Sequence, residues 1–142
     1  MASVDADLVV ALTEAQRLGF LGDRPIPEVI SHARSFVRAL AAHEPVDSVL
    51  DLGSGGGVPG LVIAHDRPNT RVTLLDRRSK RTDVLERVVR RWGWQERVSV
   101  ICGDAATFDH GSFDAVVARG FGPPELTLTL ARRLVRLGGR LF

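Results

Sequence analysis

A glycine-rich segment in the first half of the chain has the residue types of a nucleotide-binding loop. It reads Asp51-Leu-Gly-Ser-Gly-Gly-Gly-Val-Pro-Gly60, with four glycines in five positions. Glycines at this density allow positive φ angles and let the backbone approach a ligand closely. The spacing of Gly55, Gly57 and Gly60 also matches the dinucleotide fingerprint, and the free amides of a following helix favour a carboxylate or phosphate. Alone, the segment predicts a nucleotide-like ligand.

Three acidic residues near the ends of apolar strands narrow the choice of ligand. Asp51 directly precedes the loop, where nicotinamide-binding loops usually carry an apolar residue. Asp76 follows Gly53 by 23 residues, where a carboxylate can accept both ribose hydroxyls. Asp104 follows a third strand and could accept the adenine amino group. Together they favour an adenosine-plus-amino-acid ligand over a pyrophosphate, although Asp76 and Asp104 could also be ordinary strand-end caps.

The elements that would position these residues are visible in the apolar periodicity. Spacings of three and four predict two helices before residue 45, the first over 5–18 and the second starting at Pro25-Ile-Pro27. Strands are then expected at 48–52, 71–75, 97–101, 113–118 and 139–142, and helices near 58–65, 79–92 and 124–137. Strand–helix alternation at this spacing predicts an α/β fold with a parallel sheet, whose ligand crevice lies at the carboxyl ends of the strands.

Composition excludes several classes of protein. The chain of 142 residues is 44% hydrophobic, enough to bury the core of one domain. Its apolar runs are short and bounded by charge, and its first twenty residues do not resemble a secretory signal. A single cysteine, Cys102, suits a reducing compartment and offers no metal cluster. We therefore expect a cytoplasmic protein without a metal site.

The positive charge is concentrated in the middle of the chain. Residues 67–97 hold ten basic residues against four acidic ones, a net charge of +6, whereas residues 1–66 have a net charge of −5. A basic segment of this kind is compatible with a polyanionic partner. An arginine-rich helix facing solvent explains it equally well, so both interpretations stay open.

Three segments together resemble the class I S-adenosylmethionine (SAM) dependent methyltransferases. More narrowly, they are similar to the bacterial small-subunit ribosomal RNA guanine-N7 methyltransferase family, methyltransferase G or glucose-inhibited division protein B. The segments are the loop with its Pro59-Gly60 ending, Val72-Thr-Leu-Leu-Asp76 followed by Ser79-Lys-Arg81, and Phe113-Asp-Ala-Val-Val-Ala-Arg119 with Pro123 nearby. The resemblance covers about residues 46–142.

The resemblance implies a set of functional residues. SAM, which leaves as S-adenosylhomocysteine, would be bound by Asp51, Gly53, Ser54, Gly55, Gly57, Asp76, Arg77, Asp104, Ala105 and Arg119. Arg119 would also be the catalytic residue that orients the nucleotide, and Lys80 and Arg81 would contact RNA. A surface ion pair for Arg119 and a solvated helix start for Lys80 and Arg81 are the alternatives. Guanine N7 carries no proton, so methyl transfer to it needs mainly alignment.

The family resemblance also implies an architecture. We expect a doubly wound Rossmann-like sheet of order 3-2-1-4-5 over residues 46–142, with a helical lid over residues 1–45. The chain ends inside the expected fifth strand, so we expect the C-terminal strands of the family to be missing and the sheet edge to be completed by further chain or by a homodimer.

The activity that this architecture supports has alternatives. The main expectation is methylation of ribosomal RNA or of the 30S subunit. Methylation of a small molecule and a non-catalytic SAM-binding module are the main rivals, and a nicotinamide oxidoreductase is a further one.

Overall fold

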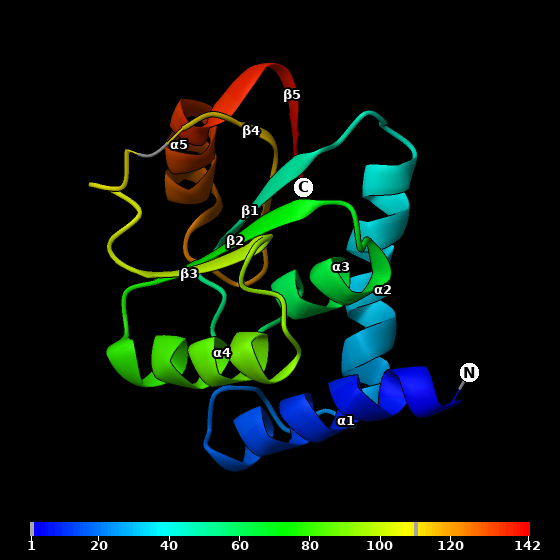
Figure 1. Ribbon diagram of the computed structural model, residues 1–142. Helices are drawn as coiled ribbons and strands as arrows, with labels where there is room; N and C mark the ends of the chain where they lie inside the picture. Colours follow the sequence, from blue (N-terminus) through cyan, green and yellow to red (C-terminus); the bar gives the residue numbers. More distant parts are fainter. Residues whose placement is uncertain (1, 110) are drawn as a thin grey trace.

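A five-stranded parallel sheet forms the centre of the computed structural model, which describes residues 2–109 and 111–142 (Figure 1). The strands are β1 Ser48–Leu52, β2 Arg71–Asp76, β3 Val98–Cys102, β4 Phe113–Ala118 and β5 Val135–Leu141. They are arranged in the order β3-β2-β1-β4-β5, and every neighbouring pair is parallel. The fold class and strand order predicted from the sequence are confirmed.

Helices cover both faces of this sheet. They are α1 Ala2–Arg17, α2 Ile26–Ala41, α3 Gly60–Asp66, α4 Ser79–Arg91 and α5 Pro124–Leu134. In Figure 1, α3 and α4 lie against one face and α5 against the other, while α2 lies alongside α3 and α1 lies beyond α4. None of the helices in the described ranges is long and apolar enough to cross a membrane.

Burial on both faces explains the composition of the central strand. Val49 and Leu50 of β1 point to opposite faces, and both are fully buried. Val49 belongs to the core formed with α3 and α4, whereas Leu50 belongs to the core formed with α5. A parallel strand covered by helices on both faces needs a nearly continuous apolar run, which is why β1 does not alternate with polar residues.

The two N-terminal helices join the core on the α3 side. Val29 and Ala33 of α2 pack with Leu8 of α1 and Val62 of α3 in one buried cluster. The guanidinium of Arg34 adds ion pairs to Asp5 at 2.8 Å and to Asp66 at 2.9 Å, which connects α2 to α1 and α3. Apolar contacts and ion pairs thus both hold α1 and α2 against α3. The division into a lid over 1–45 and a core over 46–142 stays a prediction.

Several element boundaries differ from those predicted. Helix α3 begins at Gly60, because residues 53–59 form the turns of the glycine loop. Helix α5 ends at Leu134 and β5 begins at Val135, four residues before the predicted strand. The register between β4 and β5 shifts between Phe113 and Ala115, an irregularity of the β-bulge kind. At this edge of the sheet Leu137 is 98% exposed.

Candidate functional site

Backbone hydrogen bonds join the carboxyl ends of β1, β2 and β3. The amides of Gly53 and Ser54 both donate to the carbonyl of Leu75, at 2.8 and 2.9 Å. One strand further, the amide of Gly103 donates to the carbonyl of Asp76 at 2.9 Å. The fold therefore brings the glycine loop, Asp76 and the segment that contains Asp104 to the same edge of the sheet.

The side chain of Asp76 connects this edge to the glycine loop. Its Oδ2 accepts the backbone N–H of Gly55 at 2.9 Å, and its Oδ1 accepts that of Arg78 at 2.9 Å. The residue is only 6% exposed. Because each carboxylate oxygen can accept two hydrogen bonds, both oxygens keep a lone pair for a further donor. Asp76 is therefore both a structural anchor of the loop and a candidate ligand-binding group.

A fully buried carboxylate, that of Asp51, lies beneath the loop. Its Oδ2 accepts the backbone N–H of Gly60 at 3.0 Å, whereas its Oδ1 has no hydrogen-bond partner among residues 2–109 and 111–142. Burial raises the pKa of Asp51 to about 7; the neighbouring Ser54 hydroxyl and the hydrogen bond from Gly60 lower it, the charge of Asp76 raises it, and the charge of Arg119 lowers it. Asp51 is thus held in a site that disfavours its charge.

The beginning of α3 differs from the expectation of free amides. The N–H of Gly60 is used by Asp51, and the N–H of Leu61 donates to the carbonyl of Gly57 at 2.7 Å. The helix start therefore does hold a negative group, the carboxylate of Asp51, and these two amides are not free for a ligand. The physical reason is that a buried carboxylate and the loop carbonyl already satisfy them.

Two loop glycines make room for neighbouring side chains. A Cβ atom on Gly53, whose φ is +72°, would lie 2.6 Å from the ring of Phe121. A Cβ atom on Gly57, whose φ is +109°, would lie 2.5 Å from Leu61. Ser54 is buried, and its hydroxyl donates to the carbonyl of Asp51 at 3.2 Å. Packing alone accounts for glycine at these two positions, so ligand contacts from Gly53, Gly57 and Ser54 stay predictions.

The turn between α1 and α2 covers the glycine loop. Side-chain and backbone atoms of Leu21 and Phe20 lie so close to Gly56 that a Cβ there would meet them at 2.6 to 2.8 Å. The guanidinium of Arg81 lies 5.6 Å from the centre of the Phe20 ring and 4.0 Å from Oδ2 of Asp76. Arg81 therefore bridges this turn and the loop, whereas the sequence predicted an RNA contact for it.

The other predicted site residues are distributed around the same edge. Asp104 is exposed, and its Oδ1 accepts the N–H of Ala106 at 2.9 Å, while Ala105 is buried. Arg77 and Lys80 are exposed. These positions leave Asp104, Arg77 and Lys80 accessible to a ligand.

Arg119 directly follows β4 on the other side of the loop. It is half-buried, and within the described ranges it forms no salt bridge. Its positive charge acts on the buried Asp51. A surface ion pair does not account for Arg119, which leaves its guanidinium available at the end of β4.

Two aromatic residues at this site were not predicted. Phe20 and Phe121 lie on opposite ends of the loop, against Gly56 and Gly53. Gly19 and Gly22 bracket the first, and Gly120 and Gly122 bracket the second. The sequence signal that could have indicated Phe20 and Phe121 is an aromatic residue flanked by glycines in a segment predicted to connect two elements.

Comparison with known proteins identifies the family of this chain. The model of the GidB family, described as rRNA small subunit methyltransferase G, matches residues 8–142. The chain belongs to the rRNA small subunit methyltransferase G family. It is 36% identical over 127 residues to the ribosomal RNA small subunit methyltransferase G of Nocardioides sp., which covers 87% of the chain and 50% of that relative. It is also 36% identical over 113 residues to the corresponding protein of Burkholderia pseudomallei strain 668, covering 76% of the chain and 48% of the relative.

Solved structures agree with this membership. A SAM-dependent methyltransferase from Thiobacillus denitrificans in complex with S-adenosyl-L-homocysteine superposes with a TM-score of 0.62 at 27% identity, over 76% of this chain and 45% of that one. One from Geobacter sulfurreducens in complex with the same compound gives a TM-score of 0.63 at 27% identity, with the same coverage. This member of the family spans about half the length of the curated relatives it matches.

Proposed function

We propose that this chain binds SAM at the carboxyl edge of its sheet and takes part in methyl transfer to small-subunit ribosomal RNA. The observation that carries the proposal is the hydrogen bond from Gly55 to Asp76, which unites the glycine loop with the acid that ends β2. Membership of the methyltransferase G family supports the same activity. The solved relatives in complex with S-adenosyl-L-homocysteine support the cofactor.

The residues at this edge fit the chemistry of SAM. The remaining lone pairs of Asp76 suit the two hydroxyls of the ribose, and the exposed Asp104 beside the buried Ala105 suits the adenine. The buried Oδ1 of Asp51 lacks a donor among the described residues, and a donor is what an ammonium group or its water would supply. Gly53, Gly55 and Arg77 would line the same SAM-binding site. The donor set is therefore consistent with an adenosine and an amino-acid group.

Methyl transfer to guanine N7 requires little acid–base catalysis by the protein. When bound, SAM supplies a methyl group on a positively charged sulfur: an attacking lone pair would bond to the methyl carbon while the carbon–sulfur bond breaks and S-adenosylhomocysteine leaves. Guanine N7 has such a lone pair and no proton to remove, so the chain must align the acceptor and exclude alternatives. The guanidinium of Arg119, at the end of β4, forms no salt bridge with the residues that the structure describes and is suited to orient a phosphate or base.

Calorimetry tests the cofactor part of this proposal. The chain is titrated with SAM, S-adenosylhomocysteine and NAD under identical conditions. We expect saturable heats with the first two and none with NAD. Tight NAD binding without a response to SAM would instead establish the nicotinamide alternative.

Label transfer tests the acceptor. Methyl-labelled SAM is incubated with the chain and either naked ribosomal RNA, 30S subunits or a metabolite extract. We expect label in the small-subunit RNA. Label confined to small molecules would support the small-molecule alternative, and SAM binding without any transfer would support a non-catalytic module.

Two further features stay predictions. A cytoplasmic location follows from the proposed RNA substrate. A homodimer through the outer edge of β5 is consistent with the exposure of Leu137 on that strand. Sedimentation of the wild-type chain and of Leu137→Lys at equal concentrations would show whether this edge contributes to association.

A further inference from the structure

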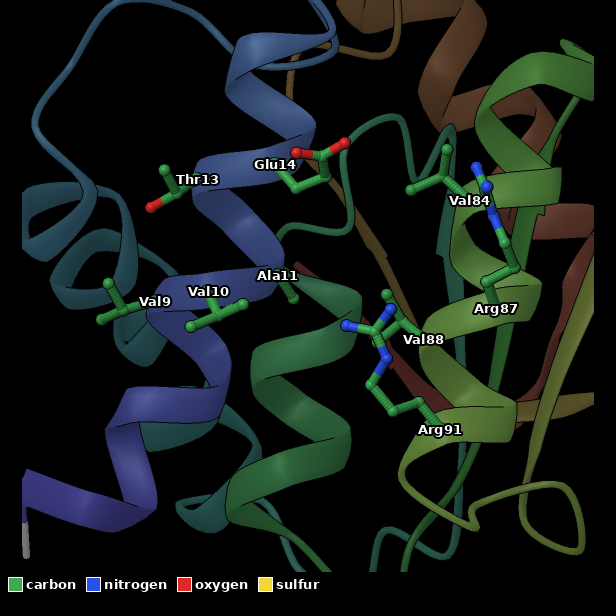
Figure 2. A pocket seen from close by; sticks show the side chains of 9 residues that line it. All are labelled: Val9, Val10, Ala11, Thr13, Glu14, Val84, Arg87, Val88 and Arg91. Carbon is green, nitrogen blue, oxygen red and sulfur yellow. The ribbon is translucent and has the colours of Figure 1, made fainter.

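A groove separates α1 from α4 on the face of the molecule away from the sheet (Figure 2). Its volume is about 510 Å³. Val10 of α1 and Val84 and Val88 of α4 line it with methyl groups, and Val10 is 59% exposed. A valine this exposed on the wall of a groove indicates a surface that is available for contact.

Two arginines give this groove a positive charge. Arg87 and Arg91 lie one turn apart on α4, both are exposed, and neither forms a salt bridge among the residues that the structure describes. In Figure 2 the side chain of Arg91 extends from α4 toward α1. The pKa of Glu14 across the groove is lowered, first by its hydrogen bond with Arg17 and also by the charges of Arg87 and Arg91. Glu14 is already bonded to Arg17, so the two arginines keep their capacity for another anion.

The same side of α4 leads back to the proposed cofactor site. Lys80 lies seven residues before Arg87, nearly two full turns, which places both on one face of the helix about 10 Å apart along its axis. Lys80 is exposed and follows Asp76 by four residues. Lys80, Arg87 and Arg91 therefore place cations along α4 from the carboxyl edge of the sheet into the groove, with the exposed Asp83 between the first two.

We propose that this face of α4, from Lys80 to the groove at Arg87 and Arg91, binds the phosphate backbone of the RNA substrate. This inference rests on the proposed function, because it concerns the part of the same RNA substrate that lies outside the transfer site. An RNA acceptor is much longer than its target nucleotide, so its neighbouring phosphates must contact the surface beside the site. Arginine and lysine heads bind such phosphates, while the valines contact the apolar faces of the riboses.

An acidic protein segment is the other partner that this chemistry admits. RNA is favoured because the cations continue beyond the apolar part of the groove, to Lys80 and to the exposed Arg77 and Arg78 at the cofactor edge. A helix seated on the valines would need acidic residues only beside Arg87 and Arg91. Cations spread over the length of α4 match an extended polyanion better than a short amphipathic segment.

Matched charge removals test the surface. The double variant Arg87→Gln/Arg91→Gln is compared with Arg38→Gln/Arg132→Gln, which removes the same charge from exposed arginines of α2 and α5 that form no salt bridge in the described ranges. The probe is a fluorescent single-stranded RNA of mixed sequence, titrated at several salt concentrations. We expect the groove variant to bind roughly tenfold more weakly. Its slope of log affinity against log salt should fall by about 1.4, since each phosphate contact on a single strand contributes about 0.7.

Three outcomes would overturn the inference. If the two double variants bound RNA equally well, the groove would not be part of the RNA-binding surface. Weaker binding with an unchanged salt slope would show that phosphates are not the ligand. Unchanged RNA binding together with lost binding of polyglutamate would assign the groove to an acidic protein.

A separate measurement distinguishes this inference from the proposed function. SAM binding by calorimetry should be the same in the wild-type chain and in both double variants. If neither the wild-type chain nor either double variant bound SAM, the proposed function would be contradicted. The difference in RNA affinity between the two double variants would still decide the role of the groove. A Val10→Ser variant, which keeps the charges, should retain most of the RNA affinity.

Discussion

The carboxylate of Asp76 accepts the backbone N–H of Gly55 at 2.9 Å. One side chain thereby links the end of β2 to the loop that follows β1, twenty-one residues earlier in the chain. The same carboxylate also accepts the N–H of Arg78. Asp76, which we propose holds the ribose of SAM, thus also stabilises the loop itself.

Replacing Asp76 should affect both folding and cofactor binding. Asp76→Ala leaves two backbone N–H groups without their charged acceptor, and we expect a loss of about 2–4 kcal/mol in the free energy of unfolding. Asp76→Asn keeps one acceptor oxygen and should lose less. Both variants should bind SAM at least about tenfold more weakly, one lost hydrogen bond to a charged group being enough for that. Urea denaturation and calorimetry measure the two effects, and full SAM affinity in Asp76→Ala would remove this residue from the site.

Asp51 should make the stability of the protein depend on pH in an unusual direction. Its folded pKa of about 7 is above the ordinary value of 3.8. Between these two values the folded state holds a proton that the unfolded state has released, so the free energy of unfolding falls as the pH rises from 4 to 7 and then levels. Carboxyls with lowered pKa values, such as Asp66 and Asp114, act in the opposite sense.

The variant Asp51→Asn isolates this contribution, because the other carboxyls are common to both proteins. Relative to the wild type, the variant should gain stability as the pH rises from 5 to 8, by about 2.6 kcal/mol, because only about two pH units of the shift lie in this range. Urea denaturation of both proteins at several pH values gives the difference. A difference that does not change with pH would show that Asp51 is ionised with an ordinary pKa in the fold.

Gly53 and Phe121 should be energetically coupled. Alanine at Gly53 must adopt a φ of +72° and places its Cβ 2.6 Å from the aromatic ring, so Gly53→Ala should cost about 1–2 kcal/mol for the backbone and more for the contact. Phe121→Ala removes the ring and should relieve only the second part. A double-mutant cycle by urea denaturation should therefore give a coupling of about 0.5–3 kcal/mol, and strictly additive effects would mean that the ring does not rest on Gly53 in solution.

Arg119 should matter for transfer more than for cofactor binding. Its guanidinium forms no salt bridge in the described ranges, so Arg119→Ala should fold normally and bind SAM with little change. Transfer to ribosomal RNA should fall by roughly 10- to 100-fold if one charge-assisted contact of about 1.5–3 kcal/mol is lost. Arg119→Lys, which keeps the charge, should recover part of the rate. Unchanged transfer in Arg119→Ala would show that this guanidinium does not orient the acceptor.

The sequence by itself determined the type of fold and the class of site. Short apolar runs alternating with helical spacings require a parallel sheet, because such strands can be buried only between helices. The motifs around Asp51, Asp76 and Arg119 indicated the family from local order alone. The acidic residues converge because the carboxyl ends of parallel strands share one edge of the sheet.

Only the tertiary structure decided what the individual side chains contact. Arg81 lies against Phe20 and Asp76, and the first amide of α3 is bonded to Asp51, because segments far apart in the sequence pack together there. The groove between α1 and α4 likewise depends on the packing of two helices that are separated by about sixty residues. Periodicity reports which face of an element is buried, but it does not report which other element covers that face. For this reason the family was readable from the sequence, and the partners of each residue were not.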